Sequence, residues 1–298
     1  MKPAGLSVLI PVYNWPVEGL VRALLAQLPD WPGPAEILLL DDGSAPEFRQ
    51  RNRLLAELPG VQYEELPRNV GRAAIRNQLV ARAQYPWLLL LDNDSSLPDA
   101  QFLARYAAAS AQAPVLVGGT CYPATPPADA ALRLRWHYGR QREQRPATLR
   151  QQLPYAQLTV NNLLIQAAVF RQFGLDEELT RYGHEDTKFG WHLREAGVPV
   201  LHLDNPVLHD GLEPAEAFLR KSRDAVRNLA ALYRAEGLGT DSRLLTMALR
   251  LGRLGLATAA RRTLQLLEPR LRRQVLGAKP NLRAFDLLKL LWLLQELT

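Results

Sequence analysis

The sequence is poor in cysteine and in long hydrophobic runs. Cys121 is the only cysteine among 298 residues, so no internal disulfide can form and we expect a reducing compartment. No apolar stretch approaches the length of a membrane-spanning helix, and residues 1–5 lead into a strand-like segment rather than a signal peptide. The hydrophobic fraction of 47% and the charged fraction of 22% are ordinary for a soluble globular protein and exclude disordered and fibrous classes. These properties predict a cytoplasmic protein.

Acidic residues are scarce in the C-terminal part. Residues 220–298 contain 16 Lys and Arg against 6 Asp and Glu, whereas residues 1–219 contain 20 against 24. The net charge of +6 is therefore +10 in the C-terminal part and −4 in the rest. A basic, leucine-rich, helical segment suits an anionic membrane surface, a nucleic acid or an acidic protein. The alternative is a helical cap with a solvated basic face.

Strand-like and helix-like segments alternate through the first half of the chain. Short apolar runs bounded by turn formers predict strands at 6–12, 36–40, 61–66, 87–91 and 115–118. Helical spacing of apolar residues predicts helices at 17–28, 48–57, 71–83 and 99–110. This alternation predicts an α/β domain with a three-layer, mostly parallel sheet, similar to the Rossmann fold.

The second half of the chain lacks the regular alternation of strands and helices. Residues 120–160 carry several prolines and an arginine-rich stretch, which predicts a long functional loop over the sheet edge. Further strands and helices are predicted at 158–165, 167–173, 185–196 and 198–203, and helices alone at 214–235, 242–256 and 285–297. We therefore expect one domain over residues 1–212 and a basic helical extension over residues 213–298.

Carboxylates follow the predicted strands. Residues 41–42 and 92–94 each come directly after an apolar run, and residues 185–186 open a predicted helix. Open α/β sheets bind ligands at the carboxyl ends of their strands. Several carboxylates at one edge would repel each other, and a divalent cation that holds a phosphate would relieve this. Asp92 and Asp94 would share one side of an extended chain and could hold such an ion, although an Asp-rich turn has the same pattern.

Six motifs occur in the order typical of one enzyme family. They are Ser7-Val8-Leu9-Ile10-Pro11-Val12-Tyr13-Asn14, Asp41-Asp42-Gly43-Ser44, Asn69-Val70-Gly71 with Arg76-Asn77, Asp92-Asn93-Asp94, Asn161-Asn162 and Gly183-His184-Glu185-Asp186. Over about residues 6–210 the chain resembles a family 2 glycosyltransferase with the GT-A fold. The resemblance implies an inverting enzyme that moves a sugar from a nucleotide-diphosphate sugar, most commonly a UDP-sugar, to an acceptor hydroxyl. It implies Mn²⁺ or Mg²⁺ as cofactor, a glycan or lipid-linked acceptor, a part in cell-surface glycan or glycolipid synthesis, and no nucleic-acid partner.

The resemblance also implies roles for single residues. Asp186 would be the general base and Glu185 would orient the acceptor or the sugar. Asp92, Asp94 and His209 would hold the metal ion. The residues that it places around the donor are Pro11, Tyr13, Asn14, Asp41, Asp42, Asn69, Gly71, Arg76, Asp92, Asn161 and Asn162.

Each of these motifs also has a purely structural interpretation. Asp41-Asp42 suits a turn, and Glu185-Asp186 suits a helix N-terminus. Arg72 and Arg76 share a helix face, which could be solvated. His184, His192 and His202 are alternatives to His209 as the metal ligand, and of these His202 is expected in the core.

Two other functions fit parts of the pattern. A nucleotidyltransferase of related fold would carry a Gly-rich loop after the first strand, which residues 12–16 lack. A non-catalytic nucleotide or carbohydrate binder would not need the acidic residues. Trp191 is followed by His192 and no Gln-x-x-Arg-Trp motif appears, so addition of single sugars is expected rather than polymer synthesis. The arginine-rich loop 133–150 would meet an acceptor phosphate or act as a solvated lid, and the basic helices would recruit the enzyme to the inner face of a membrane.

Overall fold

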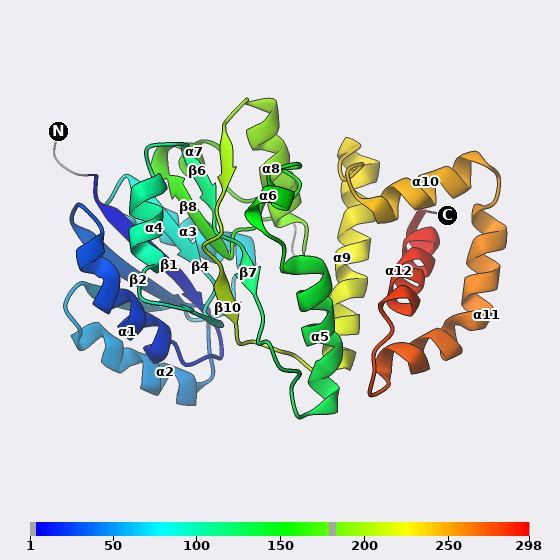
Figure 1. Cartoon of the computed structure of the whole chain (residues 1–298), viewed down its shortest axis with the longest axis horizontal. Helices are drawn as coiled ribbons and strands as arrows, with labels where there is room; N and C mark the ends of the chain where they lie inside the picture. Colours follow the sequence, from blue (N-terminus) through cyan, green and yellow to red (C-terminus); the bar gives the residue numbers. More distant parts are fainter. Residues whose placement is uncertain (1–3, 179–182, 298) are drawn as a thin grey trace. The chain divides into compact units, whose positions relative to one another are not determined.

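The computed structural model describes residues 4–178 and 183–297, which form two compact units (Figure 1). The N-terminal unit contains residues 4–122, 144–178 and 185–211. The helical unit contains residues 123–143, 183–184 and 212–297. Residues 123–143 thus pack with the C-terminal helices, whereas the sequence predicted a loop over the edge of the sheet.

The main sheet of the described chain has seven strands in the order β3-β2-β1-β4-β8-β6-β9. Neighbouring strands run parallel except at β8, which is antiparallel to both β4 and β6. The strands are β1 (Leu6–Val12), β2 (Ala35–Asp41), β3 (Val61–Glu65), β4 (Trp87–Leu91), β6 (Val115–Val117), β8 (Asn162–Gln166) and β9 (Val200–His202).

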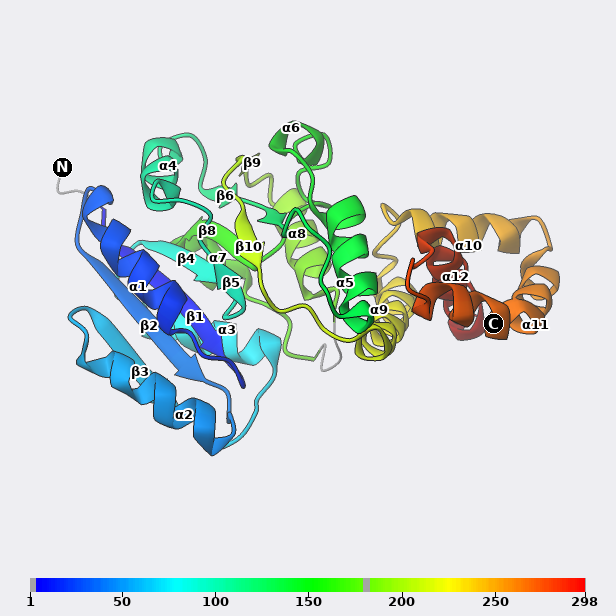
Figure 2. The ribbon, with the colours of Figure 1, turned by 60° about the horizontal axis from the view of Figure 1, so that its bottom comes forward.

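Helices cover both faces of this sheet, which is why its central strands are continuously apolar. One face packs against α1 (Glu18–Gln27) and α4 (Phe102–Ala109), and Figure 2 shows α1 lying across β1 and β2. The other face packs against α3 (Arg72–Arg82), α7 (Ala167–Phe173) and α8 (Glu185–Glu195). The predicted α/β fold with three layers and a mostly parallel sheet is therefore confirmed. The other helices of this unit are η1 (Leu28–Asp30), α2 (Pro46–Arg53), η2 (Leu54–Glu57) and α6 (Ala147–Arg150).

A second, smaller sheet brings distant segments together. Its strands are β5 (Ser95–Ser96), β10 (Val207–His209) and β7 (Thr120–Cys121), with β10 in the middle. In its register His209 pairs with Ser95, the residue that directly follows Asp94. The sheet therefore places His209 beside the acidic motif.

The helical unit is built around α12 (Leu282–Leu297), which contacts α9 (Ala215–Glu236), α10 (Arg243–Arg253) and α11 (Ala257–Leu276) (Figure 1). Apolar residues occur all round α12, as expected for a central helix. Residues 123–143 contribute η3 (Ala130–Leu132), α5 (Arg133–Tyr138) and the π-helical turn η4 (Gly139–Glu143). Within the described residues, no helix combines the length and hydrophobicity needed to cross a membrane.

Candidate active site

The parallel strands β1, β2 and β4 end at one edge of the main sheet, and the segments that follow them meet there. Asn93 donates a hydrogen bond through Nδ2 to the Tyr13 carbonyl oxygen over 3.2 Å, so the ends of β4 and β1 are linked. Asn14, with φ of 47°, accepts from the Ala45 amide through Oδ1 at 2.8 Å. At this edge, where the nucleotide is predicted to bind, the Tyr13 side chain is exposed and Pro11 is half-buried.

The two aspartates at the end of β2 shape the loops of this edge. Asp41 is fully buried and accepts from the Ser44 amide at 2.7 Å and from the Tyr63 hydroxyl at 3.1 Å. Asp42 accepts from the Val70 amide at 2.7 Å. Burial raises the pKa of Asp42, although the Val70 and Gly71 amides oppose this. Asp41 therefore helps to hold these loops, which is the role foreseen as the structural alternative, while nucleotide contacts of Asp41 and Asp42 stay predictions.

The loop after Asp42 leads into α3. Asn69 accepts from the Gly71 amide through Oδ1 at 3.1 Å, and Gly71 adopts φ of 95°, where a side chain would be strained. Asn69 is exposed at this turn and Gly71 is the residue before α3 begins. The turn thus brings the N-terminal part of α3, with Arg72 and Arg76, to the sheet edge.

Arg76 forms an ion pair with Asp92 in which the arginine is buried and the carboxylate is half-buried. Its side chain is 5% exposed and its Nη2 donates to Asp92 Oδ1, while the Asp92 side chain is 21% exposed. Nη1 of Arg76 donates to the Arg72 carbonyl oxygen at 3.0 Å, which fixes the guanidinium. A solvated helix face is therefore excluded for Arg76, and Asp92 is held by a cation of the protein itself.

Asp94 lies beside His209, at 3.6 Å between Oδ1 and Nδ1. Burial acts to raise the pKa of Asp94, but His209 and Arg72 together hold it below its ordinary value. In the part of the chain that the structure describes, no three acidic, His or Cys side chains gather closely enough to hold an ion. The predicted trio of Asp92, Asp94 and His209 is therefore not gathered in these residues, because Asp92 pairs with Arg76, and a metal site at Asp94 and His209 stays a prediction. An oxygen and an imidazole nitrogen suit Mn²⁺, and diphosphate oxygens can complete such a set.

Two further residues at this pair were not singled out from the sequence. Gly211 comes so close to Asp94 that a Cβ atom at Gly211 would collide with the carboxylate. The ring of Tyr122 packs edge-on against the His209 ring at 5.4 Å between centroids. A glycine two residues after a histidine was the only sequence signal for Gly211, and Tyr122 gave none because its partner lies on another strand.

Glu185 and Asp186 form the first turn of α8. Glu185 is buried, with Arg72 Nη1 4.0 Å from its Oε1. Oδ1 of Asp186 is buried and has no hydrogen-bond partner among the described residues. Burial raises the pKa of Asp186 to about 8, Glu185 adds to the rise, and Arg76 opposes it. This carboxyl is thus a basic, unsatisfied group rather than a helix cap.

The carboxylates of β4 and α8 belong to one site. The charge of Arg72 lowers the pKa of both Asp94 and Asp186, and the charges of Arg76 and Asp92 also act on Asp186. These groups are therefore close enough to interact although they lie on three different elements. Such a cluster of perturbed acids at strand ends is what active sites of α/β proteins contain.

Comparison with known proteins assigns the chain to a family. The model of glycosyl transferase family 2 matches residues 7–171, which contain β1, β2, β4 and the Asp92-Asn93-Asp94 motif. The chain belongs to glycosyl transferase family 2. It is therefore a glycosyltransferase, as the order of its motifs predicted. No curated protein matches it significantly.

Solved structures show the GT-A fold of family 2 at low identity. The mannosyltransferase PcManGT from Pyrobaculum calidifontis, in complex with GDP-Man and Mn²⁺, is 17% identical with a TM-score of 0.59, over 95% of this chain and 78% of that one. S. aureus TarS 1-349 in complex with UDP-GlcNAc is 16% identical with a TM-score of 0.53, over 98% and 90%. The same TarS fragment in complex with UDP has 17% identity and a TM-score of 0.51, over 98% and 90%. These similarities confirm the fold.

The two residues of the Asn161-Asn162 motif in this family 2 chain have different surroundings. Asn162 is fully buried, and its Nδ2 donates to the carbonyl oxygens of Gly119 at 2.9 Å and Asn205 at 2.8 Å. Asn161 donates to Thr120 Oγ1 at 2.8 Å, while its Oδ1 is buried without a partner among the described residues. Asn162 therefore supports the fold of this edge, and the predicted donor contact is carried forward for Asn161.

Proposed function

We propose that the protein is an inverting, metal-dependent glycosyltransferase in which Asp186 is the general base. The unpartnered Oδ1 of Asp186 is the observation that supports this most strongly. A buried carboxylate oxygen without a hydrogen bond is unfavourable unless a ligand supplies one, and an acceptor hydroxyl is a suitable donor. A pKa of about 8 makes Asp186 a stronger base than an ordinary carboxylate.

The proposed reaction is one displacement. Asp186 takes the proton of the acceptor hydroxyl as the oxygen attacks the anomeric carbon from the side opposite the leaving nucleoside diphosphate. The bond from the anomeric carbon to the diphosphate oxygen breaks as the new glycosidic bond forms, so the anomeric configuration inverts. Glu185 and Arg72 lie beside Asp186, where Glu185 would orient the acceptor or sugar and Arg72 would pair with the diphosphate.

Asp94 and His209 are the residues that would hold Mn²⁺ or Mg²⁺ on the diphosphate. When bound, the ion neutralises the charge that develops on the leaving group. Asp92 contributes by fixing Arg76, and the orphan Oδ1 of Asn161 would accept a hydrogen bond from the donor. The predicted contacts of Pro11, Tyr13, Asn14, Asp42, Asn69 and Gly71 with the nucleotide are part of the same proposal.

Replacement of Asp186 by Asn tests this function. We expect nucleoside diphosphate release in the presence of acceptor to fall by at least about 100-fold, since general-base catalysis contributes that much or more. Donor binding, followed as a thermal shift with nucleotide and Mn²⁺, should persist. Glu195→Gln, on the exposed end of α8, is the matched control and should behave as wild type. Normal transfer by Asp186→Asn would refute the assignment.

The donor is proposed to be a UDP-sugar and the acceptor a glycan or lipid-linked glycan of the cell surface. The similar structures of TarS contain UDP or UDP-GlcNAc, and that of PcManGT contains GDP-Man. These complexes support a nucleotide-diphosphate sugar as the donor in general. A thermal-shift series with UDP, GDP, CDP and dTDP, each with Mn²⁺ or with EDTA, identifies the base. Stabilisation by GDP and not by UDP would reject the UDP-sugar.

A peripheral position on an anionic membrane is proposed for the helical unit. Residues 243–283 contain ten Lys and Arg against one acidic residue. Leu266 on α11 is 85% exposed, and Arg262, Arg270 and Arg273 share its outer face by helical spacing. Leu254, between α10 and α11, is also exposed. Exposed leucines among arginines are typical of helices that lie in a membrane interface.

Liposome flotation tests this membrane contact. Vesicles with phosphatidylglycerol should carry the wild-type protein, and Leu254→Glu with Leu266→Glu should reduce binding by at least about tenfold, since each buried leucine contributes about 1.5–3 kcal/mol. Leu54→Glu is the control, because Leu54 is 64% exposed but lies in the N-terminal unit. Equal loss from both changes, or no flotation at low salt, would exclude the proposed contact.

A further inference from the structure

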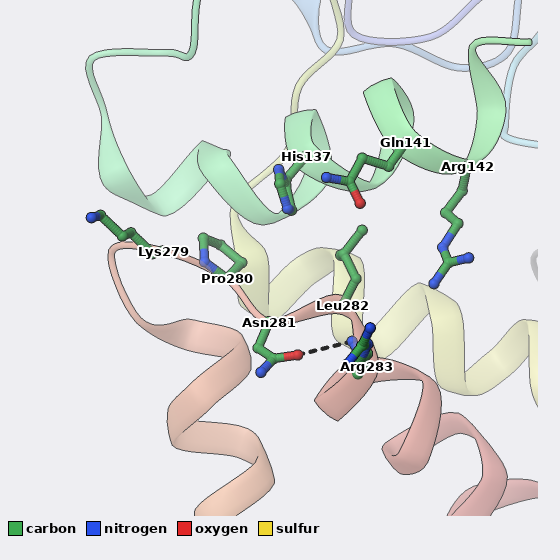
Figure 3. Close-up of a pocket in the computed structure, with 8 residues that line it drawn as sticks. All are labelled: His137, Gln141, Arg142, Lys279, Pro280, Asn281, Leu282 and Arg283. Carbon is green, nitrogen blue, oxygen red and sulfur yellow. Dashed lines mark hydrogen bonds between the residues drawn. The ribbon is translucent and has the colours of Figure 1, made fainter.

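The helical unit contains a hollow of about 450 Å³, whose lining includes none of the residues assigned above to the transfer reaction (Figure 3). The end of α5 and the π-helical turn η4 form one wall, and the segment before α12 forms the other. Its polar lining residues are His137, Gln141, Arg142, Lys279, Asn281 and Arg283.

An ion pair between the buried Arg135 and the partly exposed Glu143 supports the first wall. Arg135 donates through Nη1 to Glu143 at 3.0 Å, and its guanidinium lies over the Phe218 ring at 5.2 Å. Glu143 is the last residue of η4, so the pair holds the π turn in place. Figure 3 shows Gln141 and Arg142 reaching from this turn toward the segment opposite. π-helical turns are rare in proteins, and those that occur often lie at functional sites.

The second wall is equally fixed. The Asn281 amide donates to the Gln274 carbonyl oxygen at 3.1 Å. Asn281 Oδ1 accepts from the amides of Arg283 at 2.9 Å and Ala284 at 3.1 Å, which caps α12 (Figure 3). The backbone that carries Lys279 and Arg283 is therefore ordered before any ligand arrives.

Positive charge at the hollow is only partly compensated. Arg142 pairs with Asp286 at 2.7 Å, and the same carboxylate also pairs with Lys289 at 3.2 Å. Within residues 4–178 and 183–297, the side chains of Lys279 and Arg283 have no acidic or hydrogen-bonding partner. Lys279, Arg283 and Arg142 thus line one hollow, and among the described residues Asp286 is the acidic residue that pairs with any of these three cations.

We propose that this hollow binds a phosphate group carried by a larger polar molecule. Guanidinium and ammonium groups make strong, charge-assisted hydrogen bonds to phosphate oxygens, and the Gln141 amide adds a neutral donor. A volume of about 450 Å³ lies in the range of small-molecule sites, which leaves room for the group that is esterified to the phosphate. A phosphorylated glycan or polyol and a phospholipid headgroup share this chemistry. The site is independent of the transfer chemistry proposed above.

Titration with glycerol 1-phosphate tests the proposal, with EDTA present so that no metal links the ligand to the N-terminal unit. We expect saturable binding by calorimetry, and at least tenfold weaker binding for Lys279→Ala with Arg283→Ala. Arg243→Ala with Arg250→Ala removes the same charge from α10, outside the hollow, and should bind within twofold of wild type. All three proteins should melt at the same temperature, because the replaced side chains are exposed.

Two results would overturn the site: no saturable binding to the wild type, or equal weakening by both double variants, which would indicate diffuse attraction. Titration with monomeric dihexanoyl phosphatidic acid then distinguishes a phospholipid headgroup from a phosphorylated glycan or polyol. Binding at least tenfold tighter than glycerol 1-phosphate, and lost in Lys279→Ala with Arg283→Ala, identifies a phospholipid headgroup. Equal affinity for the two compounds indicates that the hollow recognises the phosphate group alone. A normal rate of glycosyl transfer in the Lys279 and Arg283 variant would leave this proposal standing, since the two sites are tested separately.

Discussion

The ion pair between Arg76 and Asp92 gives the most demanding prediction for the site. We expect Arg76→Met to lower the free energy of unfolding by about 2–4 kcal/mol. Loss of one partner from a fully buried pair costs about 3–5 kcal/mol, and the 21% exposure of the Asp92 side chain reduces this. Methionine keeps much of the volume of the arginine stem, so the effect reports mainly the unpaired carboxylate.

Arg82→Met is the matched control on the same helix. Arg82 pairs with Glu64 at 2.9 Å on the surface, with side chains 34% and 53% exposed, and such a pair contributes about 0–1 kcal/mol. The double variant Arg76→Met with Asp92→Asn should recover part of the loss, with a coupling energy of about 1–3 kcal/mol between the two sites.

Urea denaturation followed by far-ultraviolet circular dichroism and by tryptophan fluorescence measures these changes, and the two probes must agree, since two compact units need not unfold together. A second readout is catalytic. The charge of Arg76 lowers the pKa of Asp186. In Arg76→Met the transfer rate should therefore reach its maximum at a higher pH than in the wild type. Equal losses of stability for Arg76→Met and Arg82→Met would refute the reasoning.

Three further outcomes are expected. Gly211→Ala should displace the Asp94 carboxylate and weaken Mn²⁺ binding in the presence of nucleoside diphosphate by at least about tenfold, measured by calorimetry, and unchanged affinity would contradict this. The transfer rate should rise about tenfold per pH unit up to about pH 8, where Asp186 has lost its proton, and a flat profile from pH 6 to 9 would exclude Asp186 as the base. Burial lowers the pKa of His202 to about 4, so below about pH 6.5 the unfolded chain binds more protons and acidification to pH 4 should cost about 3 kcal/mol of stability. His202→Asn should flatten that dependence in urea titrations, whereas His137→Asn should not.

The main strands and the acidic motifs could be predicted because their signals are local. Each central strand is an apolar run that ends at a turn, so the position of residues 41–42 and 92–94 at the sheet edge follows from the sequence. The antiparallel direction of β8 could not be predicted, since an apolar strand reads the same in both directions.

Elements defined by their partners were missed. The strand β10 has three residues and exists because it pairs with β5 and β7. The helix α11 contains Pro269 and many arginines, which obscure its period, yet its Leu264, Leu271 and Val275 pack into the core of the helical unit. Tertiary contacts decide both elements, so local propensity could not find them.

The distribution of charge explains why similar carboxylates at one sheet edge can have different roles. Asp94 is held below its ordinary pKa by His209 and Arg72, which keeps it ionised and suited to a cation. Asp186, buried beside Glu185, has a pKa of about 8 and is suited to proton transfer. Environments that push neighbouring carboxyl pKa values apart mark a division between ligand and base. In the proposed mechanism the small sheet contributes to this division, because its strand β10 carries His209 to the side of Asp94.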